Sequence, residues 1–323
     1  MKAALVNGPR RKPRYAEFPE PVAKEGEELI CVRASALSHF TKGRASGEHY
    51  SADGMYPVVA GADGVGVTQD GRRVYFVLPD APNGAMAERT VVPSRQCIDL
   101  PAGIDDVTAA AIANPGMSAW AALVERAHLK AGETVLVNGA TGSVGRLAVQ
   151  AARYLGAGKV IATGRDAEAL EEVRGLGADT VIPFDLDGSN PQGSKEYEAA
   201  LKEQFAVGVD VVVDYLWGRS AETVVVAIAK ATEDVKPVRF VQVGGISGGE
   251  IALPGAALRS SAIVLMGSGI KSVPFPRLLA AIKSVFDVFV QTGFKMKIRT
   301  VPLAEVEETW DDGGKSRIVY VQP

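Results

Sequence analysis

The most regular feature of the chain is an apolar stretch that ends in three evenly spaced glycines and leads into an amphipathic segment. Residues 134–138 are strand-like, and Gly139, Gly142 and Gly145 follow in the pattern G-x-x-G-x-x-G. Beyond Gly145, apolar residues recur about every 3.6 positions, which is the period of a helix with one buried face. Residues 159–163 are again β-rich. The pattern predicts a strand, a glycine turn, a helix and a second strand.

Four more strand-like runs follow, each separated from the next by enough residues for a helix. They lie at 180–182, 209–213, 239–243 and 263–266. Strands that alternate with helices form parallel sheets covered by helices on both faces. The second half of the chain is therefore predicted to be an α/β domain built on a doubly wound, six-stranded parallel sheet.

The rest of the chain is divided into short β-type runs by glycine and proline clusters. In the first 112 residues, these runs lie at 1–6, 29–34, 58–60, 73–78 and 90–92. This composition is typical of antiparallel, barrel-like domains. After the sixth strand of the parallel sheet, the pattern predicts a helix over 277–292 and strands over 297–301 and 317–321.

We expect the last of these segments to return to the first domain. The predicted domains are therefore a β-rich one formed by residues 1–112 and 270–323, and a sheet domain formed by residues 113–269. The polar stretch 185–196 is predicted to be a surface loop.

Composition excludes several classes of protein. The 323 residues carry a net charge of −3, from 35 basic and 38 acidic side chains, which argues against nucleic-acid binding as the main role. We expect no membrane-spanning stretch, because the apolar start Met1–Val6 breaks at Asn7-Gly8-Pro9 like a β-strand. We therefore expect a cytoplasmic protein. Cys31 and Cys97 are too few for a disulfide framework and are interpreted as small buried hydrophobic residues.

The glycine turn has the chemistry of a pyrophosphate site. Gly139 permits a tight turn, Gly142 lets the backbone approach a phosphate, and Gly145 lets the helix pack against the strand. Unpaired N–H groups and a partial positive charge at the helix N-terminus then stabilise the anion. The residues expected to contact a dinucleotide here are Gly139, Thr141, Gly142, Ser143, Val144 and Gly145.

The end of the second strand of this unit indicates which dinucleotide binds. It reads Thr163-Gly164-Arg165, and a guanidinium at this point pairs with a 2′-phosphate. NADPH is therefore favoured over NADH. Two alternatives stay open: Arg165 is a solvated loop cation, or Asp166 is the carboxylate that binds the ribose. We favour Asp166 as the N-cap of a helix over 167–174.

Motifs along nearly the whole chain resemble those of the medium-chain dehydrogenase/reductase superfamily. They are residues 34–38 (ASALS), 56–66 (YPVVAGADGVG), 84–88 (GAMAE), 135–145 (VLVNGATGSVG), 176–179 (LGAD), 209–214 (VDVVVD), 241–244 (VQVG) and 314–319 (GKSRIV). The nearest match is the zinc-independent, quinone oxidoreductase-like branch, which is similar to zeta-crystallin. The resemblance implies a Rossmann domain that binds NADP(H) and a GroES-like barrel domain.

The same resemblance implies further cofactor residues at the carboxyl ends of the strands. The backbone of Leu216 is expected beside the ribose. The residues expected around the nicotinamide are Asn114, Met117, Ser118, Val243, Gly244, Gly245, Gly267, Ser268 and Gly269. Alternatively, Gly244, Gly245, Gly267 and Gly269 are ordinary turn residues.

The resemblance also bears on metal binding. Zinc-dependent members carry a Cys after the early alanine-rich turn and a His-Glu pair in the later glycine segment. In this chain Ser38 stands at the first position, and Ala62 and Asp63 stand at the second. His39 has no cysteine or second histidine beside it. We therefore expect no metal.

Without a metal, the favoured reaction is hydride transfer from NADPH to an electron-poor carbonyl or conjugated alkene. Ser38, Tyr50 and Tyr56 are the candidate catalytic hydrogen-bond donors, and His39 and His49 are possible proton sources. Tyr56, which precedes Pro57, is equally compatible with a packed strand residue. Water is an alternative source of the proton.

The sequence thus predicts an NADPH-dependent oxidoreductase that acts on a quinone or another conjugated carbonyl. One alternative is a reductase of enoyl or alkenal double bonds, which would share every cofactor residue. Another is a low-turnover NADPH-binding sensor or structural protein. We also expect a homodimer, because the apolar sixth strand, within residues 260–269, could pair with its own copy.

Overall fold

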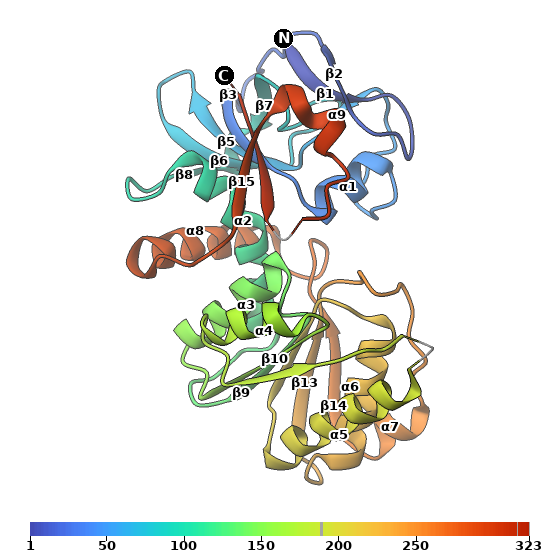
Figure 1. Ribbon diagram of the computed structural model, residues 1–323. Helices are drawn as coiled ribbons and strands as arrows, with labels where there is room; N and C mark the ends of the chain where they lie inside the picture. The colour runs from blue at the N-terminus through green and yellow to red at the C-terminus, as the bar shows by residue number, and fades with distance from the viewer. Residues whose placement is uncertain (188–189, 315, 323) are drawn as a thin grey trace. The chain divides into compact units, whose positions relative to one another are not determined.

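The computed structural model describes residues 1–187, 190–314 and 316–322, so Lys315 of the C-terminal motif lies outside the described residues. The chain forms two compact units, one from Met1–Asn114 with Ile282–Pro323 and the other from Pro115–Ala281 (Figure 1). The second boundary thus falls at 281 rather than at the expected 269. The reason is that Val273 and Leu278 pack against Ala121, which belongs to the second unit.

The second unit contains the predicted six-stranded parallel sheet. Its strand order is β11-β10-β9-β12-β13-β14, and every neighbouring pair is parallel. The strands are β9 (Thr134–Asn138), β10 (Lys159–Gly164), β11 (Thr180–Pro183), β12 (Val211–Asp214), β13 (Pro237–Gln242) and β14 (Ala262–Gly267). The order reverses between β10-β9 and β12, which is the topology of a doubly wound sheet.

Both faces of this sheet are buried under helices. The helices are α3 (Ser143–Tyr154), α4 (Ala167–Arg174), α5 (Pro191–Val207), α6 (Gly218–Ala231) and the short α7 (Gly255–Arg259). Val135 and Val137 of β9 pack with α3 on one face, while Leu136 packs with α5 and α6 on the other. Burial on both sides explains why the strands read as continuous apolar runs rather than as alternating ones.

The predicted loop at 185–196 is wrong in its second half. Helix α5 begins at Pro191, and Asn190 caps it by accepting a hydrogen bond from the backbone N–H of Gly193 at 2.9 Å. Asn followed by Pro is a helix-start signal, because the side chain satisfies an open N–H and proline has none to satisfy. Residues 188 and 189 lie outside the described residues.

The first unit is β-rich and mainly antiparallel, as predicted. One sheet has the order β2-β1-β4, and a larger one has the order β15-β16-β3-β5-β6-β8 with β7 also paired to β3. The strands are β1 (Lys2–Val6), β2 (Arg14–Glu17), β3 (Glu27–Ala36), β4 (Val58–Val59), β5 (Asp63–Thr68), β6 (Arg73–Val77), β7 (Arg89–Pro93), β8 (Cys97–Asp99), β15 (Ile298–Pro302) and β16 (Arg317–Val321). Because β16 pairs with β3, the end of the chain does return to the first unit.

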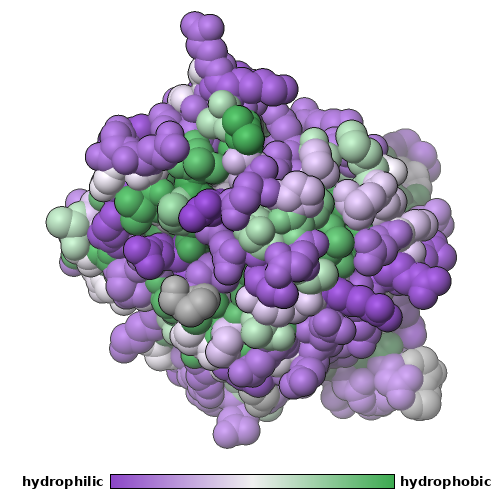
Figure 2. All heavy atoms as spheres, turned by 90° about the horizontal axis from the view of Figure 1, so that it is seen from above, coloured by the Kyte–Doolittle hydropathy of each residue, from purple (hydrophilic) through white to green (hydrophobic). Residues whose placement is uncertain are grey.

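Short helices complete the first unit, and two longer helices contain the boundaries between the units. The short ones are α1 (His39–Ser46), α9 (Val306–Thr309) and the single turns η1 (Ser94–Gln96) and η3 (Leu303–Glu305), and the longer ones are α2 (Asp106–Trp120) and α8 (Phe275–Thr292). The space-filling view shows a mostly hydrophilic face with small separated apolar areas (Figure 2). Such a surface is ordinary for a protein in water.

One helical stretch corrects the expectation that nothing in the chain could span a bilayer. Helix α2 continues into the π-helical segment η2 (Ala121–Arg126), and together they are long and apolar enough to do so by length and composition. However, 61% of the most apolar window is buried inside the protein. We interpret it as a core helix, whose apolar residues contact protein rather than lipid.

The three glycines of the turn differ in what surrounds them. Gly139 has a φ of +88°, and a Cβ there would meet the side chain of Leu216 at 2.8 Å. A Cβ on Gly145 would lie 2.3 Å from the carbonyl oxygen of Gly139 and 2.6 Å from the Cα of Ala140. The nearest atom to a Cβ on Gly142 is 3.9 Å away. Two of the glycines are therefore required by the fold, and Gly142 is not.

This difference predicts that alanine substitutions at Gly145 and Gly142 change the stability of the protein by unequal amounts. Gly145→Ala should destabilise the protein by about 1–3 kcal/mol, because backbone atoms rather than a flexible side chain must move aside. Gly142→Ala should change the free energy of unfolding by less than about 0.5 kcal/mol. Urea unfolding of both variants measures this, and equal losses in the two would contradict the assignment.

Candidate functional site

The N-terminus of helix α3 is open to a ligand. Gly142 is its N-cap and has no side chain, so no side-chain oxygen satisfies the first N–H groups of the helix. Gly142 is exposed, and no protein atom occupies the position of its missing Cβ. The residues present therefore fit a phosphate group, which would fill this space and accept those N–H groups.

The loop that carries this helix is fixed to the neighbouring strand. The N–H groups of Gly139 and Ala140 both donate to the carbonyl of Thr163, at 3.2 and 2.9 Å. Arg146, which is 8% exposed, donates from Nε to the carbonyl of Thr141 at 3.0 Å and pairs with Glu172 of α4 at 2.7 Å. A rigid loop holds its open N–H groups in place before a ligand arrives.

The end of β10 carries the residues expected to distinguish the two dinucleotides. Gly164 lies under the side chain of Thr141, whose Cγ2 is 2.7 Å from the position of a Cβ on Gly164. Arg165 is exposed. Asp166 caps α4 by accepting the N–H of Ala169 at 3.1 Å, as we favoured from the sequence. The Asp166 carboxylate is thus engaged with the helix, and Arg165 can turn toward an anion.

The expected nicotinamide residues lie in several elements. Asn114, Met117 and Ser118 are half-buried in α2, Val243 and Gly244 directly follow β13, and Ser268 and Gly269 directly follow β14. Gly245 and Gly267 line one pocket of about 400 Å³ in the second unit, together with Trp217, Phe240, Leu265 and Met266. That volume lies within the range of ligand pockets, roughly 300–1,000 Å³.

The sequence analysis missed two buried polar residues that end adjacent strands, Asn138 of β9 and Asp214 of β12. Both side chains are fully buried, and Asn138 Nδ2 donates to Asp214 Oδ1 at 2.8 Å. Burial raises the pKa of Asp214 to about 6. A signal was present in the sequence, because a polar residue closes each of two otherwise apolar strands.

In the first unit, Ser38 is the N-cap of α1. Its Oγ accepts the backbone N–H of Thr41 at 2.9 Å and lies 2.9 Å from the Thr41 hydroxyl. Thr41 is almost completely buried, whereas Ser38 is half-buried. If Thr41 donates to Ser38, the Ser38 O–H remains available to a ligand.

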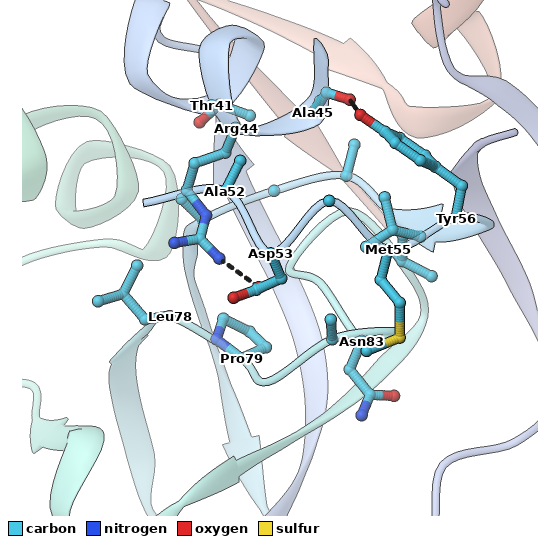
Figure 3. A pocket seen from close by; sticks show the side chains of 17 residues that line it. Thr41, Arg44, Ala45, Ala52, Asp53, Met55, Tyr56, Leu78, Pro79 and Asn83 are labelled. Carbon is cyan, nitrogen blue, oxygen red and sulfur yellow. Dashed lines mark hydrogen bonds and ion pairs between the residues drawn. The ribbon is translucent and has the colours of Figure 1, made fainter. Parts of the chain in front are cut away.

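Tyr56 lines a small pocket in the same unit (Figure 3). Its OH donates to the carbonyl of Ala45 at 3.2 Å, so the hydroxyl already supports the end of α1. Arg44, on the opposite wall, pairs with Asp53 at 3.2 Å. The cavity volume is about 40 Å³, which admits a few water molecules but not a quinone ring.

The remaining candidates of the first unit lie outside this pocket. Tyr50 is 57% exposed, and its ring centroid is 4.2 Å from that of His49. Partial burial and the charge of Arg44 lower the pKa of His49, which makes it a weak proton source at neutral pH. His39 is the first residue of α1 and is exposed. Of the three candidate donors, Tyr56 lines this pocket, whereas Ser38 and Tyr50 do not.

A buried group of charges stands where the zinc-dependent relatives carry His-Glu. The Oδ2 of Asp63 accepts the hydroxyl of Tyr75 at 2.8 Å, and Asp63 is also influenced by the buried Arg317 of β16. Burial raises the pKa of Asp63 to about 6. Within the described residues, no group of three or more His, Cys, Asp or Glu side chains is placed to hold a metal ion. That the protein works without a metal stays a prediction.

A family model described as zinc-binding dehydrogenase matches residues 143–284. The chain is 29% identical over 363 aligned positions to the "Probable NADPH-dependent quinone reductase tdiC" of Emericella nidulans, and the match covers 99% of this chain and 100% of that protein. It is 34% identical over 181 positions to the chloroplastic NADPH-dependent alkenal/one oxidoreductase of Arabidopsis thaliana, covering 51% of this chain and 46% of that one.

Among solved structures, the fold is similar to that of the quinone oxidoreductase from Thermus thermophilus, which was also solved with NADPH. The TM-score is 0.79 and the sequence identity is 24%, and the match covers 99% of this chain and 100% of that one. This similarity supports the arrangement of the chain into a parallel sheet unit and a β-rich unit.

The buried Asp63 predicts a specific dependence of stability on pH. Its folded pKa, about 6, lies above the ordinary value of 3.8, so the folded protein binds more protons than the unfolded chain between these values. The contribution of Asp63 to the free energy of unfolding should therefore fall as the pH rises from 4 to 6, by about 3 kcal/mol at most, and stay constant above that.

Asp63→Asn removes this titration and keeps an acceptor for Tyr75. The free energy of unfolding of the wild type minus that of the variant should decrease between pH 4.5 and 6.5, as measured by urea unfolding across that range. A difference that is constant over the range, or that rises, would refute the raised pKa.

Proposed function

Because the chain belongs to the medium-chain dehydrogenase/reductase superfamily, in its zinc-independent quinone oxidoreductase-like branch, we propose that it is an NADPH-dependent reductase of quinones and other conjugated carbonyls. The observation that carries this proposal is the uncapped N-terminus of α3. Gly142 is exposed there and leaves room for a phosphate group, and an exposed arginine follows the next strand.

Gly139, Thr141, Gly142, Ser143, Val144 and Gly145 would hold the pyrophosphate, and Thr163, Gly164 and Arg165 would hold the phosphorylated ribose. Leu216 would border the ribose. The residues proposed around the nicotinamide are Asn114, Met117, Ser118, Val243, Gly244, Gly245, Gly267, Ser268 and Gly269. When bound, NADPH supplies the hydride.

On the substrate side, Ser38 is the best placed of the three candidate donors. If the Thr41 hydroxyl donates to Ser38, as the Thr41 N–H does, the Ser38 O–H can donate to a substrate and stabilise a developing oxyanion. Polarisation along the Thr41–Ser38 pair strengthens that donation. Tyr56 has its OH engaged by Ala45, so we assign it a positioning role. Tyr50, with 57% of its surface exposed, is the third candidate for substrate contact.

Reduction of the double bond of an enone or alkenal is the second candidate function. It is favoured by the similarity to the Arabidopsis alkenal/one oxidoreductase, and it uses the same cofactor residues. A sensor with little turnover would bind NADPH and reduce neither class of substrate. For each of these three candidate functions, we propose that the protein is cytoplasmic.

The test is a substrate panel of quinones, enones and alkenals, run with NADPH and NADH side by side and followed by the loss of nicotinamide absorbance. We expect turnover with NADPH and at least one quinone. Arg165→Asp should raise the KM for NADPH by about 10- to 100-fold, since a charged hydrogen bond is replaced by repulsion, and should leave the KM for NADH nearly unchanged.

Arg259→Asp is the matched control, because it changes the net charge equally at an exposed arginine of α7. Binding of NADPH without turnover of any substrate would favour the sensor. The absence of any preference for NADPH in the wild type would contradict the proposed cofactor.

We further propose a homodimer formed through β14. This strand is at the edge of the parallel sheet, pairs only with β13 within the described residues, and carries Val264 with 45% of its surface exposed. An exposed apolar edge strand is a template for pairing with a second copy across a two-fold axis.

Val264→Lys should shift the protein from dimer to monomer in analytical ultracentrifugation, because a charge at an edge strand opposes pairing. Val235→Lys is the control, since Val235 is 88% exposed and lies outside the sheet. A wild type that sediments as a monomer, or a variant that still sediments as a dimer, would exclude this interface.

A further inference from the structure

We propose that Asn138 and Asp214 are a buried positioning pair that holds the cofactor-binding strand ends of the second unit in register. The inference rests on the proposed function, since it concerns residues assigned there to NADPH. Neither side chain lines the pocket of the second unit, and both are 0% exposed. They would act on the cofactor through the segments that they hold.

Asn138 connects β9 to three other elements of the unit. Its Oδ1 accepts hydroxyl groups from Thr163 of β10 at 2.6 Å, Ser220 of α6 at 2.9 Å and Tyr197 of α5 at 3.1 Å. Its Nδ2 donates to Asp214 of β12 at 2.8 Å. The three hydroxyl donors on one side and the carboxylate on the other fix which way the amide points.

Asp214 in turn holds the loop that follows β12. Its Oδ1 accepts the N–H of Leu216 at 3.1 Å, and its Oδ2 accepts the N–H of Trp217 at 3.1 Å. Trp217 has a φ of +57°, a conformation that is strained for a residue other than glycine. The carboxylate stabilises this conformation, because Oδ1 and Oδ2 together accept both N–H groups, and Oδ1 also lies 3.3 Å from the Trp217 nitrogen.

Backbone hydrogen bonds extend the arrangement to the ends of β9, β10 and β13, which are assigned to the cofactor. The carbonyl of Asp214 accepts the N–H groups of Val243 and Gly244 at 2.8 and 3.1 Å, and the carbonyl of Thr163 accepts those of Gly139 and Ala140. The pyrophosphate turn, the ribose loop and the nicotinamide segment are therefore joined through one polar cluster. A change at its centre should displace all three together.

The burial of this cluster makes it costly to disturb. An unpaired polar group in a protein interior lowers stability, and an unpaired charged group lowers it more. Among the described residues, no cationic side chain forms an ion pair with Asp214. Its charge is instead stabilised by N–H donors. These donors point at the carboxylate only while the loop after β12 keeps its present conformation.

The test compares Asp214→Asn with Asp210→Asn, which lies just before the other end of β12. Asp210 is the matched control because its Oδ2 also accepts a backbone N–H, that of Thr134 at 2.8 Å. This contact lies at the amino ends of the strands, whereas the assigned cofactor residues follow the carboxyl ends. The measurements are the Kd of NADPH by isothermal titration, the melting temperature, and the KM values for NADPH and for a quinone.

We expect Asp214→Asn to raise the Kd and the KM of NADPH by about tenfold or more, since its amide group turns an N–H donor toward the N–H of Leu216 or Trp217. The KM for the quinone should change less than about twofold, and Asp210→Asn should leave the Kd unchanged. Equal shifts of the Kd in the two variants, or no shift in Asp214→Asn, would overturn the proposal.

If Asp214→Asn does not fold, Ser220→Ala decides, because it removes one hydroxyl donor to Asn138 with little change in shape, at a buried residue of α6 that is not assigned to the cofactor. A Kd for NADPH raised about threefold supports the pair, and an unchanged Kd overturns it. A wild type that does not bind NADPH would instead refute the proposed function, which separates the two failures.

Discussion

The close approach of helix α3 to strand β9 is the contact on which the cofactor cradle depends. At Gly145 the helix comes so near the carbonyl of Gly139 that even one methyl group is excluded. This approach points the first turn of the helix at the open space beside Gly142, so the partial positive charge of the helix acts where an anion would lie. Arg146 keeps the loop from moving away, since its guanidinium joins the loop carbonyl of Thr141 to α4.

The two units differ in how much of each could be predicted from sequence. In the parallel sheet, the central strands are buried on both faces, so their apolar runs stand out against the helices between them, and all six strands were located. In the β-rich unit, β2 (Arg14–Glu17) and the glycine-containing β5 (Asp63–Thr68) were not recognised as strands, because neither shows a clear apolar alternation. Helix α5 was missed at its start because a polar composition outweighed the Asn190-Pro191 signal.

The candidate site shows the same division in physical terms. Gly139 and Gly145 could be predicted because backbone geometry restricts their identity, and Asp166 could be predicted because a helix N-cap follows local rules. The engagement of Tyr56 with Ala45 was not readable, since that contact depends on how a loop folds back on α1. Nor was the environment of Asp63, whose neighbour Arg317 is far away in sequence. Long-range polar contacts of this kind leave little trace in a single sequence.

The pairing of β16 with β3 has a consequence for the order of events during synthesis. The sheet of the first unit takes strands from both sides of the second unit along the chain, whereas the second unit is one uninterrupted segment. During translation, all residues of the nucleotide-binding unit are therefore synthesised before β16, the strand that completes the β-rich sheet. The residues of β3 that pair with β16 therefore lack their strand partner until Val321 has been synthesised.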